Sequence, residues 1–259
     1  MNDVTLAGAQ TRYALRGFLR DPRALIFTVI MPVFLLLLFN AIFHGTTRLD
    51  GLSVASPSYY TASIIAYQIM LAGFGSLLIS VTTDREGGLL KRFRGTPMPS
   101  WVYLVSEIGQ TIVVVVATVA VLLAVGVLFY QVKLSGHMLV GLTVYVVVGT
   151  ACFCALGLAV ARICTTTDSA SAIGPFSTVV LAFLSGVFIP VAIMPAWLLD
   201  IGKVFPLEHL ARGLQTAFLV PGSTGITVAN VGVLVAWGAA GLLVAVRTFR
   251  WEPLAAGAA

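Results

Sequence analysis

The chain has 259 residues, of which 59% are hydrophobic and only 10% are charged, and its mean hydropathy is +1.01. Soluble domains carry about 25% charged residues, so this composition excludes a water-soluble enzyme and a disordered chain. We predict an all-α polytopic membrane protein with one membrane domain over residues 1–259. The net charge of +5 then reports membrane topology and indicates no nucleic-acid partner.

Six apolar runs are each long enough to cross a hydrocarbon core of about 30 Å at 1.5 Å per residue. They predict transmembrane helices at residues 25–43, 62–81, 102–129, 138–161, 170–189 and 228–246. The first run is longer than the 7–15 apolar residues typical of a cleaved signal peptide, so we expect it to be retained.

Lys and Arg residues are distributed unequally between the segments that join these runs. Eleven lie in the segments on one side and four on the other. Basic residues are enriched on the cytoplasmic side, so we expect both termini in the cytoplasm. The Ala-, Val- and Gly-rich composition favours a high-GC bacterium as the source, and the expected location is the bacterial cytoplasmic membrane.

Residues 1–23 contain a regularly spaced set of arginines: Arg12, Arg16 and Arg20. A spacing of four places them on one ridge of a helix. This pattern favours an amphipathic interfacial helix that ends at Asp21-Pro22. A basic anchor that only sets topology explains the arginines equally well.

The segment 84–97 between the second and third runs is dense in both charges and contains three apolar residues at helical spacing, Leu89, Leu90 and Phe93. Glycines and Pro97 flank a short helix over 85–94. Exposed apolar residues without a local core favour a partner surface, whereas a stop-transfer charge cluster needs neither the leucines nor the acidic residues. The predicted contact residues are Arg85, Glu86, Gly88, Leu89, Leu90, Lys91, Arg92, Phe93 and Arg94.

The segment 190–227 is moderately apolar and is interrupted by prolines. It predicts two short helices, at about 195–204 and 207–219, that dip into the outer leaflet as a re-entrant pair. Charges at that depth should pair, Asp200 with Lys203 and Glu208 with Arg212. The alternative is an interfacial loop with Trp197 at the membrane surface. The marker residues of this segment are Pro190, Pro195, Trp197, Pro206 and Glu208.

Few polar residues occur inside the predicted spans. Glu107 is read as a partly solvated interfacial acid rather than a proton relay. Asn40, Gln68 and Gln110 are uncharged and either line a pathway or join helices. The three cysteines (Cys152, Cys154, Cys164) are interpreted as buried free thiols, and the three histidines form no metal or catalytic cluster.

Several motifs together resemble a known family. The loop 84–97 has the order acidic-basic-acidic-x-Gly-x-Leu-basic-basic-aromatic-basic-x-Thr-Pro and resembles the cytoplasmic loop of type-2 ATP-binding-cassette (ABC) exporter permeases. Three further stretches resemble the same family in order along the chain: Leu19-Arg20-Asp21-Pro22-Arg23, Ser185-Gly186-Val187-Phe188-Ile189-Pro190 with the following Met194-Pro195, and the tail Arg250-Trp251-Glu252. The similarity is greatest to the daunorubicin type of drug-export permease, with Leu89 as a departure.

The resemblance implies that this chain is not an enzyme and carries no cofactor, and that ATP and Mg²⁺ bind a separate ATP-binding-cassette subunit. In agreement, no Gly-x-x-x-x-Gly-Lys-Ser/Thr loop occurs in the sequence. It also implies a second permease copy, contact with membrane lipid through the N-terminal helix, and outer helices that cap the translocation path. The uncharged spans favour a hydrophobic or amphiphilic cargo. Alternatives are a glycolipid or polysaccharide export permease, a non-transport membrane subunit and a membrane enzyme.

Overall fold

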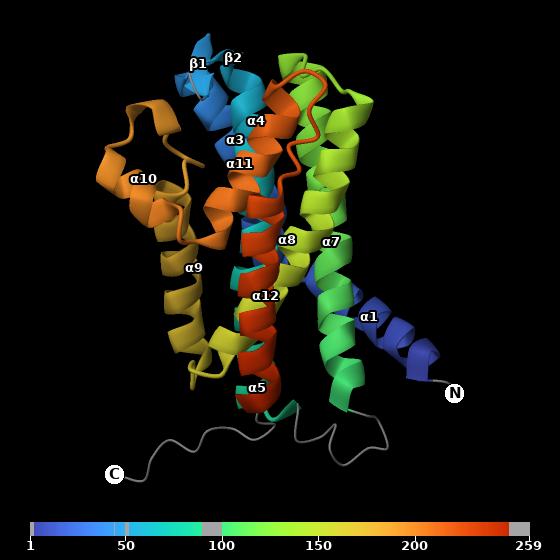
Figure 1. The fold of residues 1–259 in the computed structure, drawn as a ribbon. Helices are drawn as coiled ribbons and strands as arrows, with labels where there is room; N and C mark the ends of the chain where they lie inside the picture. Colours follow the sequence, from blue (N-terminus) through green and yellow to red (C-terminus); the bar gives the residue numbers. More distant parts are fainter. Residues whose placement is uncertain (1–2, 44, 50–51, 90–99, 249–259) are drawn as a thin grey trace.

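The computed structural model describes residues 3–43, 45–49, 52–89 and 100–248, which form a bundle of helices with few irregular segments (Figure 1). Its helices are α1 (Asp3–Arg20), α2 (Pro22–Leu25), η1 (Ile26–Ile30), α3 (Met31–Ile42), α4 (Ser56–Met70), η2 (Leu71–Ser76), α5 (Leu77–Glu86), α7 (Ser100–Tyr130), α8 (Gly136–Ala161), α9 (Thr167–Leu184), η3 (Val191–Ile193), α10 (Ala196–Gly202), α11 (Pro206–Leu219) and α12 (Val228–Thr248). The predicted helical class is confirmed.

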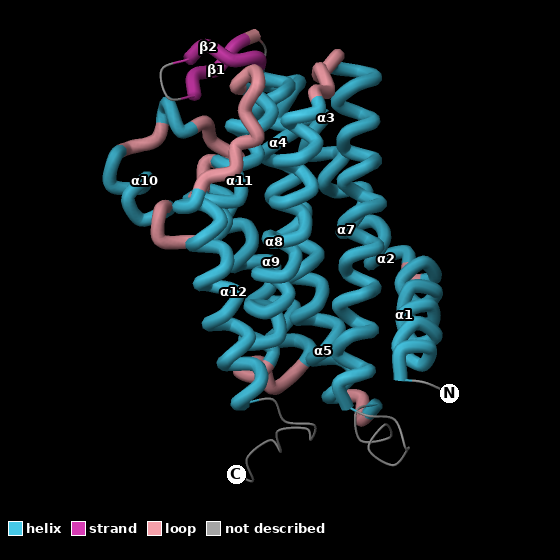
Figure 2. The backbone as a smooth tube through the Cα atoms, turned by 45° about the vertical axis from the view of Figure 1, so that its right-hand side comes forward, coloured by secondary structure: helices cyan, strands magenta, loops and turns pink. Residues whose placement is uncertain are grey.

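One element departs from the all-α prediction. Strands β1 (Thr46–Leu49) and β2 (Leu52–Ala55) pair antiparallel, with Thr46 opposite Ala55, and form a small hairpin above the helices (Figure 2). Its strands have four residues each, which is too short for an alternating pattern to stand out between two long apolar runs.

Among the described residues, five helices are long and apolar enough to cross a membrane: Ser56–Glu86, Val102–Tyr130, Gly136–Ala161, Thr167–Leu184 and Val228–Arg247. The first predicted run, 25–43, corresponds to a shorter apolar helix, Ile26–Ile42. The second predicted run, 62–81, is only the centre of a continuous helix through α4, η2 and α5. The fifth, 170–189, ends early at Leu184.

Two π-helical segments interrupt the first two apolar helices. In η1 the amide of Met31 bonds to the carbonyl of Ile26, one residue further back than in an α-helix. The following Pro32 has no N–H and its ring crowds the preceding turn, so a wider turn relieves it. The second segment, η2, lies beside the first, and the hydroxyls of Thr28 and Ser76 are 3.4 Å apart.

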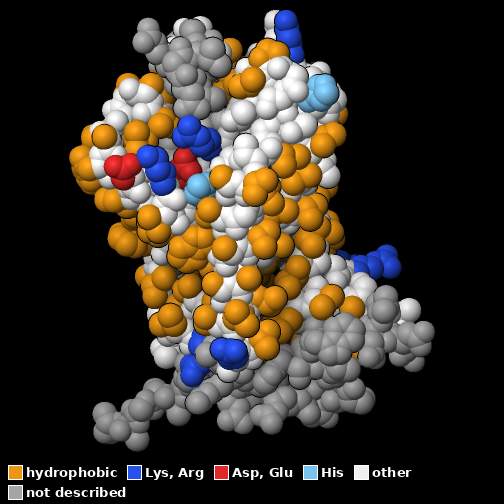
Figure 3. All heavy atoms as spheres, in the orientation of Figure 1, with side chains coloured by type: hydrophobic (Ala, Val, Ile, Leu, Met, Phe, Trp, Pro, Cys, Tyr) orange, Lys and Arg blue, Asp and Glu red, His pale blue; other side chains and the backbone are white. Residues whose placement is uncertain are grey.

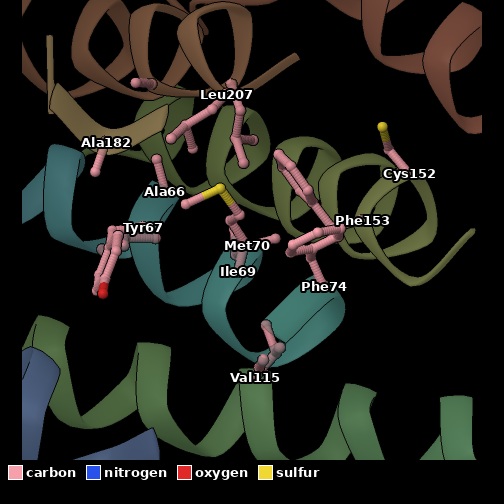
Figure 4. Close-up of a cluster of buried hydrophobic side chains, with 14 of the residues drawn as sticks. Ala66, Tyr67, Ile69, Met70, Phe74, Val115, Cys152, Phe153, Ala182 and Leu207 are labelled. Carbon is pink, nitrogen blue, oxygen red and sulfur yellow. The ribbon is translucent and has the colours of Figure 1, made fainter. Parts of the chain in front are cut away.

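The helix formed by α4, η2 and α5 occupies the centre of the bundle. Figure 4 shows Met70 and Phe74 among side chains from neighbouring helices, including Phe153 of α8 and Leu207 of α11. Close approach requires glycine here, because a Cβ at Gly157 would lie 2.8 Å from the carbonyl oxygen of Gly73.

Helices α8 and α12 pack through small residues. A Cβ at Gly238 would lie 3.2 Å from the Cα of Cys152, and one at Gly241 would lie 3.0 Å from the carbonyl carbon of Ala155. Small residues let helix backbones approach closely where lipid provides no hydrophobic driving force. The three cysteines are buried and free, as predicted.

The two ends of the bundle differ. The lower end in Figure 1 carries the last turn of α5, the α8–α9 turn and the end of α12, and the upper end carries the hairpin. On the face shown in Figure 3, the surface between the two ends is largely apolar, and charged side chains gather near α10 and α11.

Candidate coupling site and outer segment

Arg85 lies in the last turn of α5 and points into the bundle, where it is 3% exposed. Its guanidinium donates hydrogen bonds to the carbonyl oxygens of Ala161, at 2.9 Å, and of Cys164. Ala161 is the last residue of α8, and Cys164 lies in the turn that leads to α9. The last carbonyls of a helix lack intrahelical partners and favour a cation. Arg85 therefore caps α8 from a neighbouring helix.

Glu86 makes the complementary contact with α9. Its carboxylate accepts a hydrogen bond of 2.6 Å from the backbone N–H of Thr167, the first residue of that helix. The hydroxyls of Thr83 and Thr167 lie 3.3 Å apart beside it. A helix N-terminus has free N–H groups and favours an anion. Two consecutive residues of α5 thus cap two helix ends of opposite polarity.

These contacts correct the predicted contact helix over 85–94 at its start. Helix α5 continues through Glu86, so Arg85 and Glu86 are the last residues of the helix that contains the second predicted span. The Arg85 side chain is buried, whereas that of Glu86 is exposed. The helix ends where Gly88 adopts a φ of +72°, a left-handed conformation that glycine accepts without steric cost. Gly88 and Leu89 are half-buried. The other predicted contact residues, Leu90, Lys91, Arg92, Phe93 and Arg94, lie outside the described residues.

A second polar group joins α5 to α7. The Tyr103 hydroxyl donates to Asp84 at 2.8 Å, and the Ser80 hydroxyl donates to Glu107 at 2.9 Å. Glu107 is 6% exposed, so the interpretation as a partly solvated acid is wrong within this chain. The sequence could not show that Ser80 and Asp84 of α5 face Glu107 of α7, because the loop between the two helices separates them in the chain.

The outer segment contains the two short helices predicted for it, α10 and α11. Pro195 immediately precedes α10, and Pro206 is the first residue of α11, a position where the missing N–H costs nothing. Pro190 and Pro206 are buried, whereas Trp197 is 64% exposed.

The junction between α10 and α11 lies beside the middle of α12. The indole nitrogen of Trp237 donates a 3.0 Å hydrogen bond to the carbonyl of Val204, and Trp237 is close to the midpoint of α12. On the other side, a Cβ at Gly202 would lie 2.3 Å from the carbonyl oxygen of Leu184 at the end of α9. The outer segment therefore reaches well below the upper end of α12.

A buried polar cluster joins this segment to α4. The Tyr59 hydroxyl donates to the carbonyl of Gly186 at 2.6 Å. Gln215 of α11 donates to the Ser63 hydroxyl at 2.9 Å and to the same Gly186 carbonyl at 3.4 Å. Tyr59, Ser63 and Gln215 are at most 1% exposed, so these bonds are shielded from solvent and lipid.

The charges of the outer segment pair as predicted. Lys203 and Asp200 form an exposed ion pair at 2.8 Å, and Arg212 and Glu208 form a partly buried ion pair at 3.5 Å. The imidazole of His209 lies 3.1 Å from the side-chain oxygen of Asn230 and 2.9 Å from the carbonyl oxygen of Lys203.

The candidate pathway residues differ in environment. Asn40 is buried and donates to the carbonyl of Leu36 at 3.0 Å, while its own carbonyl oxygen lacks a partner within the described part of the chain. Gln68 is fully buried, and both its amide atoms lack a partner among those same residues. Gln110 is half-buried. Burial of Gln68 therefore carries the largest free-energy penalty of the three, because a buried amide without a hydrogen-bond partner destabilises the fold.

Helix α1 confirms the predicted arginine ridge. It packs against α7 where Gly109 leaves room for Thr11, since a Cβ at Gly109 would lie 3.0 Å from the Thr11 hydroxyl. On the other side of α1 the arginines are exposed, namely Arg12, Arg16 and Arg20. Tyr13 beside them is 71% exposed. The helix thus presents a basic face with apolar residues next to it.

Comparison with known proteins now adds to this geometry. A family model described as ABC-2 type transporter matches residues 6–219. The chain belongs to the ABC-2 type transporter family. It is 26% identical over 172 residues to the "Probable multidrug ABC transporter permease YbhR" of Escherichia coli K12, covering 65% of this chain and 45% of that protein. It is 25% identical over 228 residues to the "Putative transport permease YvfS" of Bacillus subtilis 168, covering 86% of this chain and 88% of that protein.

Membership of the ABC-2 transporter family supports a multi-pass transport subunit. The chain spans less than half the length of the E. coli relative. Within the described ranges, no group of three or more His, Cys, Asp and Glu side chains could hold a metal ion.

Sequence patterns did not predict the contacts of Arg85 or the polar cluster around Gly186. Charge next to a Gly-Gly pair does signal a helix end, but it does not reveal which other helix end lies nearby.

Proposed function

We propose that this chain is the membrane-spanning permease subunit of an ATP-driven ABC exporter. The observation that carries the proposal is the match of residues 6–219 to the ABC-2 type transporter family, in a chain built around long apolar helices. ATP and Mg²⁺ would bind a separate ATP-binding-cassette subunit, and this chain would hydrolyse no nucleotide.

We further propose six spans with both termini in the cytoplasm. In the described part of the chain, five helices meet the length and hydropathy of a span. The helix Ile26–Ile42 has 17 residues, or about 25 Å, the lower limit for crossing. The lower end would face the cytoplasm, because most of the basic residues lie in the segments that the topology assigns to this side. The membrane would be the cytoplasmic membrane of a bacterium.

The loop after α5 is the proposed contact with the ATPase subunit. Leu89, Leu90 and Phe93 would provide apolar contacts, and Lys91, Arg92 and Arg94 would orient them by charge pairs. Arg85 and Glu86 are left out of this surface, because their side chains already bond the ends of α8 and α9.

The outer segment and α1 also have proposed roles, at the translocation path and at the membrane surface. The junction of α10 and α11 beside the middle of α12 supports a re-entrant pair that caps the translocation path. The exposed arginines of α1 support an interfacial helix that contacts lipid headgroups.

The functional unit would contain two permease copies over two ATPase subunits. The cargo would be hydrophobic or amphiphilic, a drug, a lipid or a lipid-linked compound, as in exporters of the daunorubicin type. The printed name of the E. coli relative, a probable multidrug permease, supports this cargo class. A glycolipid or polysaccharide cargo, or a subunit without transport, is the alternative that the following test separates.

The test uses the chain together with a candidate ATP-binding-cassette subunit from the same organism. Leu90→Asp and Phe93→Asp should each reduce co-purification of the ATPase at least tenfold, because losing an apolar anchor typically costs about 2 kcal/mol or more. Arg94→Ala should have a smaller effect that grows with salt concentration. Wild-type vesicles should export amphiphilic dyes in an ATP-dependent manner. Normal assembly of both aspartate variants would contradict the proposed contact, and absence of any ATPase partner would contradict the function.

A further inference from the structure

We propose that Arg85 and Glu86 are positioning residues that join the end of α5 to the α8–α9 turn, so that displacement of the loop after α5 moves α8 and α9. This inference rests on the proposed function, because the displacement would come from the ATPase subunit. It assigns to these two residues a transmission role inside the permease instead of contact with the partner.

The loop after α5 joins two helices, α5 and α7, that are bonded to each other. The loop leaves α5 after Glu86 and enters α7 at Ser100. The two helices are joined to each other by the Tyr103–Asp84 and Ser80–Glu107 hydrogen bonds. A force on the loop therefore acts on α5 and α7 as one unit.

This unit is connected to the next two helices, α8 and α9, through the end of α5. Arg85 bonds carbonyls at the end of α8 and in the turn, and Glu86 bonds the first N–H of α9. The two bonds act on opposite sides of one short turn, residues 162–166. Each is assisted by the charge preference of the helix end that it caps. The turn is thus held from both sides by adjacent residues of α5.

Burial strengthens the contact of Arg85. Its side chain is 3% exposed, and a charge-assisted hydrogen bond shielded from water is stronger than an exposed one. Separation of α5 from the turn would leave a buried guanidinium and buried carbonyls unpaired, which is costly. The two segments are therefore expected to move together.

Helix α9 connects the α8–α9 turn to the outer segment, away from the lower end of the bundle. Helix α9 runs from this turn to Leu184, whose carbonyl oxygen lies against Gly202 at the end of α10. A shift of α9 along its axis would press on the outer segment, because no space separates these backbones. The contact at Arg85 and Glu86 thus connects the loop after α5 to the opposite half of the molecule through packed elements.

The experiment uses the complete permease–ATPase complex in proteoliposomes and measures assembly, ATP turnover and dye export in parallel. Arg85→Gln and Glu86→Ala should assemble with the ATPase and hydrolyse ATP, but export should fall at least tenfold, because alanine has no oxygen to accept the Thr167 N–H bond. Arg85→Lys should retain part of the export, since an ammonium still donates to one carbonyl. Arg247→Gln is the matched control, because Arg247 is an exposed arginine in the last turn of α12, and it should export normally.

A crosslink tests the same inference without removing Arg85. The Thr83 and Thr167 hydroxyls are 3.3 Å apart, so the double variant Thr83→Cys, Thr167→Cys should form a disulfide when oxidised with copper phenanthroline. The native Cys164 should not interfere, since burial raises the pKa of its thiol. Because the two segments move together in our inference, the crosslinked protein should export at the wild-type rate. In the Arg85→Gln background the crosslink should restore export, and dithiothreitol should abolish it again.

The outcomes are distinct. Loss of export on crosslinking the otherwise wild-type protein would show that the segments must separate and would overturn the inference. Wild-type export by both Arg85→Gln and Glu86→Ala would also overturn it, as would equal loss of assembly and export without rescue by the crosslink. Failure of the wild-type chain to bind the ATPase would instead overturn the proposed function.

Discussion

Gly213 of α11 lies against the ring of Tyr145 in α8, and a Cβ at position 213 would be 2.1 Å from the ring carbon Cζ. The Tyr145 hydroxyl in turn donates a 2.7 Å hydrogen bond to the carbonyl of Gly225, in the chain that leads to α12. One tyrosine thus packs against α11 and bonds the segment that leads from α11 to α12.

Gly213→Ala should therefore destabilise the protein strongly. Neither the helix backbone nor the buried ring can move by the distance required, and overpacking of this kind costs about 3 kcal/mol. The expected result is a clear fall in the apparent melting temperature, measured by fluorescence-detected size exclusion in detergent. Gly232→Ala is the control, because nothing lies within 4 Å of a Cβ there, and alanine favours the helix. Equal stability of the two variants would contradict the packing described for Tyr145.

Tyr59→Phe should weaken the attachment of the outer segment to α4. The change removes the donor to the Gly186 carbonyl and leaves only the longer bond from Gln215. A buried carbonyl that loses its main partner costs about 1–3 kcal/mol. We expect a lower melting temperature, whereas Tyr13→Phe on exposed α1 should change stability by less than about 0.5 kcal/mol. An unchanged melting temperature for both would show that this cluster contributes no stability.

The depth of the outer segment predicts a difference in chemical labelling. Lys203 precedes Val204, which bonds Trp237 near the middle of α12, whereas Ser223 lies in the connection above that helix. In intact membranes, Lys203→Cys should react at least tenfold more slowly than Ser223→Cys with a membrane-impermeant maleimide. Both should react quickly after denaturation in SDS. Equal rates in the membrane would favour an interfacial loop.

The six-span topology predicts the location of reporter fusions. Fusions at Gly51, Gly136 and Ser223 should report the external side, and fusions at Gly88 and after Trp251 should report the cytoplasm. An external signal from the fusion after Trp251 would indicate an odd number of spans. In that event the apolar helix Ile26–Ile42 would be the first whose assignment as a membrane span we would withdraw.

The arginine ridge of α1 predicts a dependence on anionic lipid. Charge attraction contributes about 1 kcal/mol for each basic residue near an anionic surface. Export from vesicles that contain phosphatidylglycerol should therefore exceed export from neutral vesicles. The triple variant Arg12→Gln, Arg16→Gln, Arg20→Gln should lose this difference, whereas Lys133→Gln at the upper end should retain it. If the triple variant keeps the lipid dependence, the ridge serves topology alone.

The sequence alone determined which segments form long apolar helices, because apolar runs of about 20 residues are local features. It also located the short outer helices through their prolines, and it anticipated the i,i+3 and i,i+4 ion pairs of Asp200 and Glu208, since helical spacing fixes such neighbours.

Only the tertiary structure decided where α5 ends and what its last residues contact. Arg85 and Ala161 are 76 positions apart, and no local pattern relates a guanidinium in one helix to the free carbonyls of another. The same holds for Tyr59 and Gly186, and for Glu107 and Ser80. Hydrogen bonds between segments distant in the chain depend on how the helices pack, and that packing is set by close contacts at glycines such as Gly157 and Gly213. Hydropathy and charge do not encode these contacts.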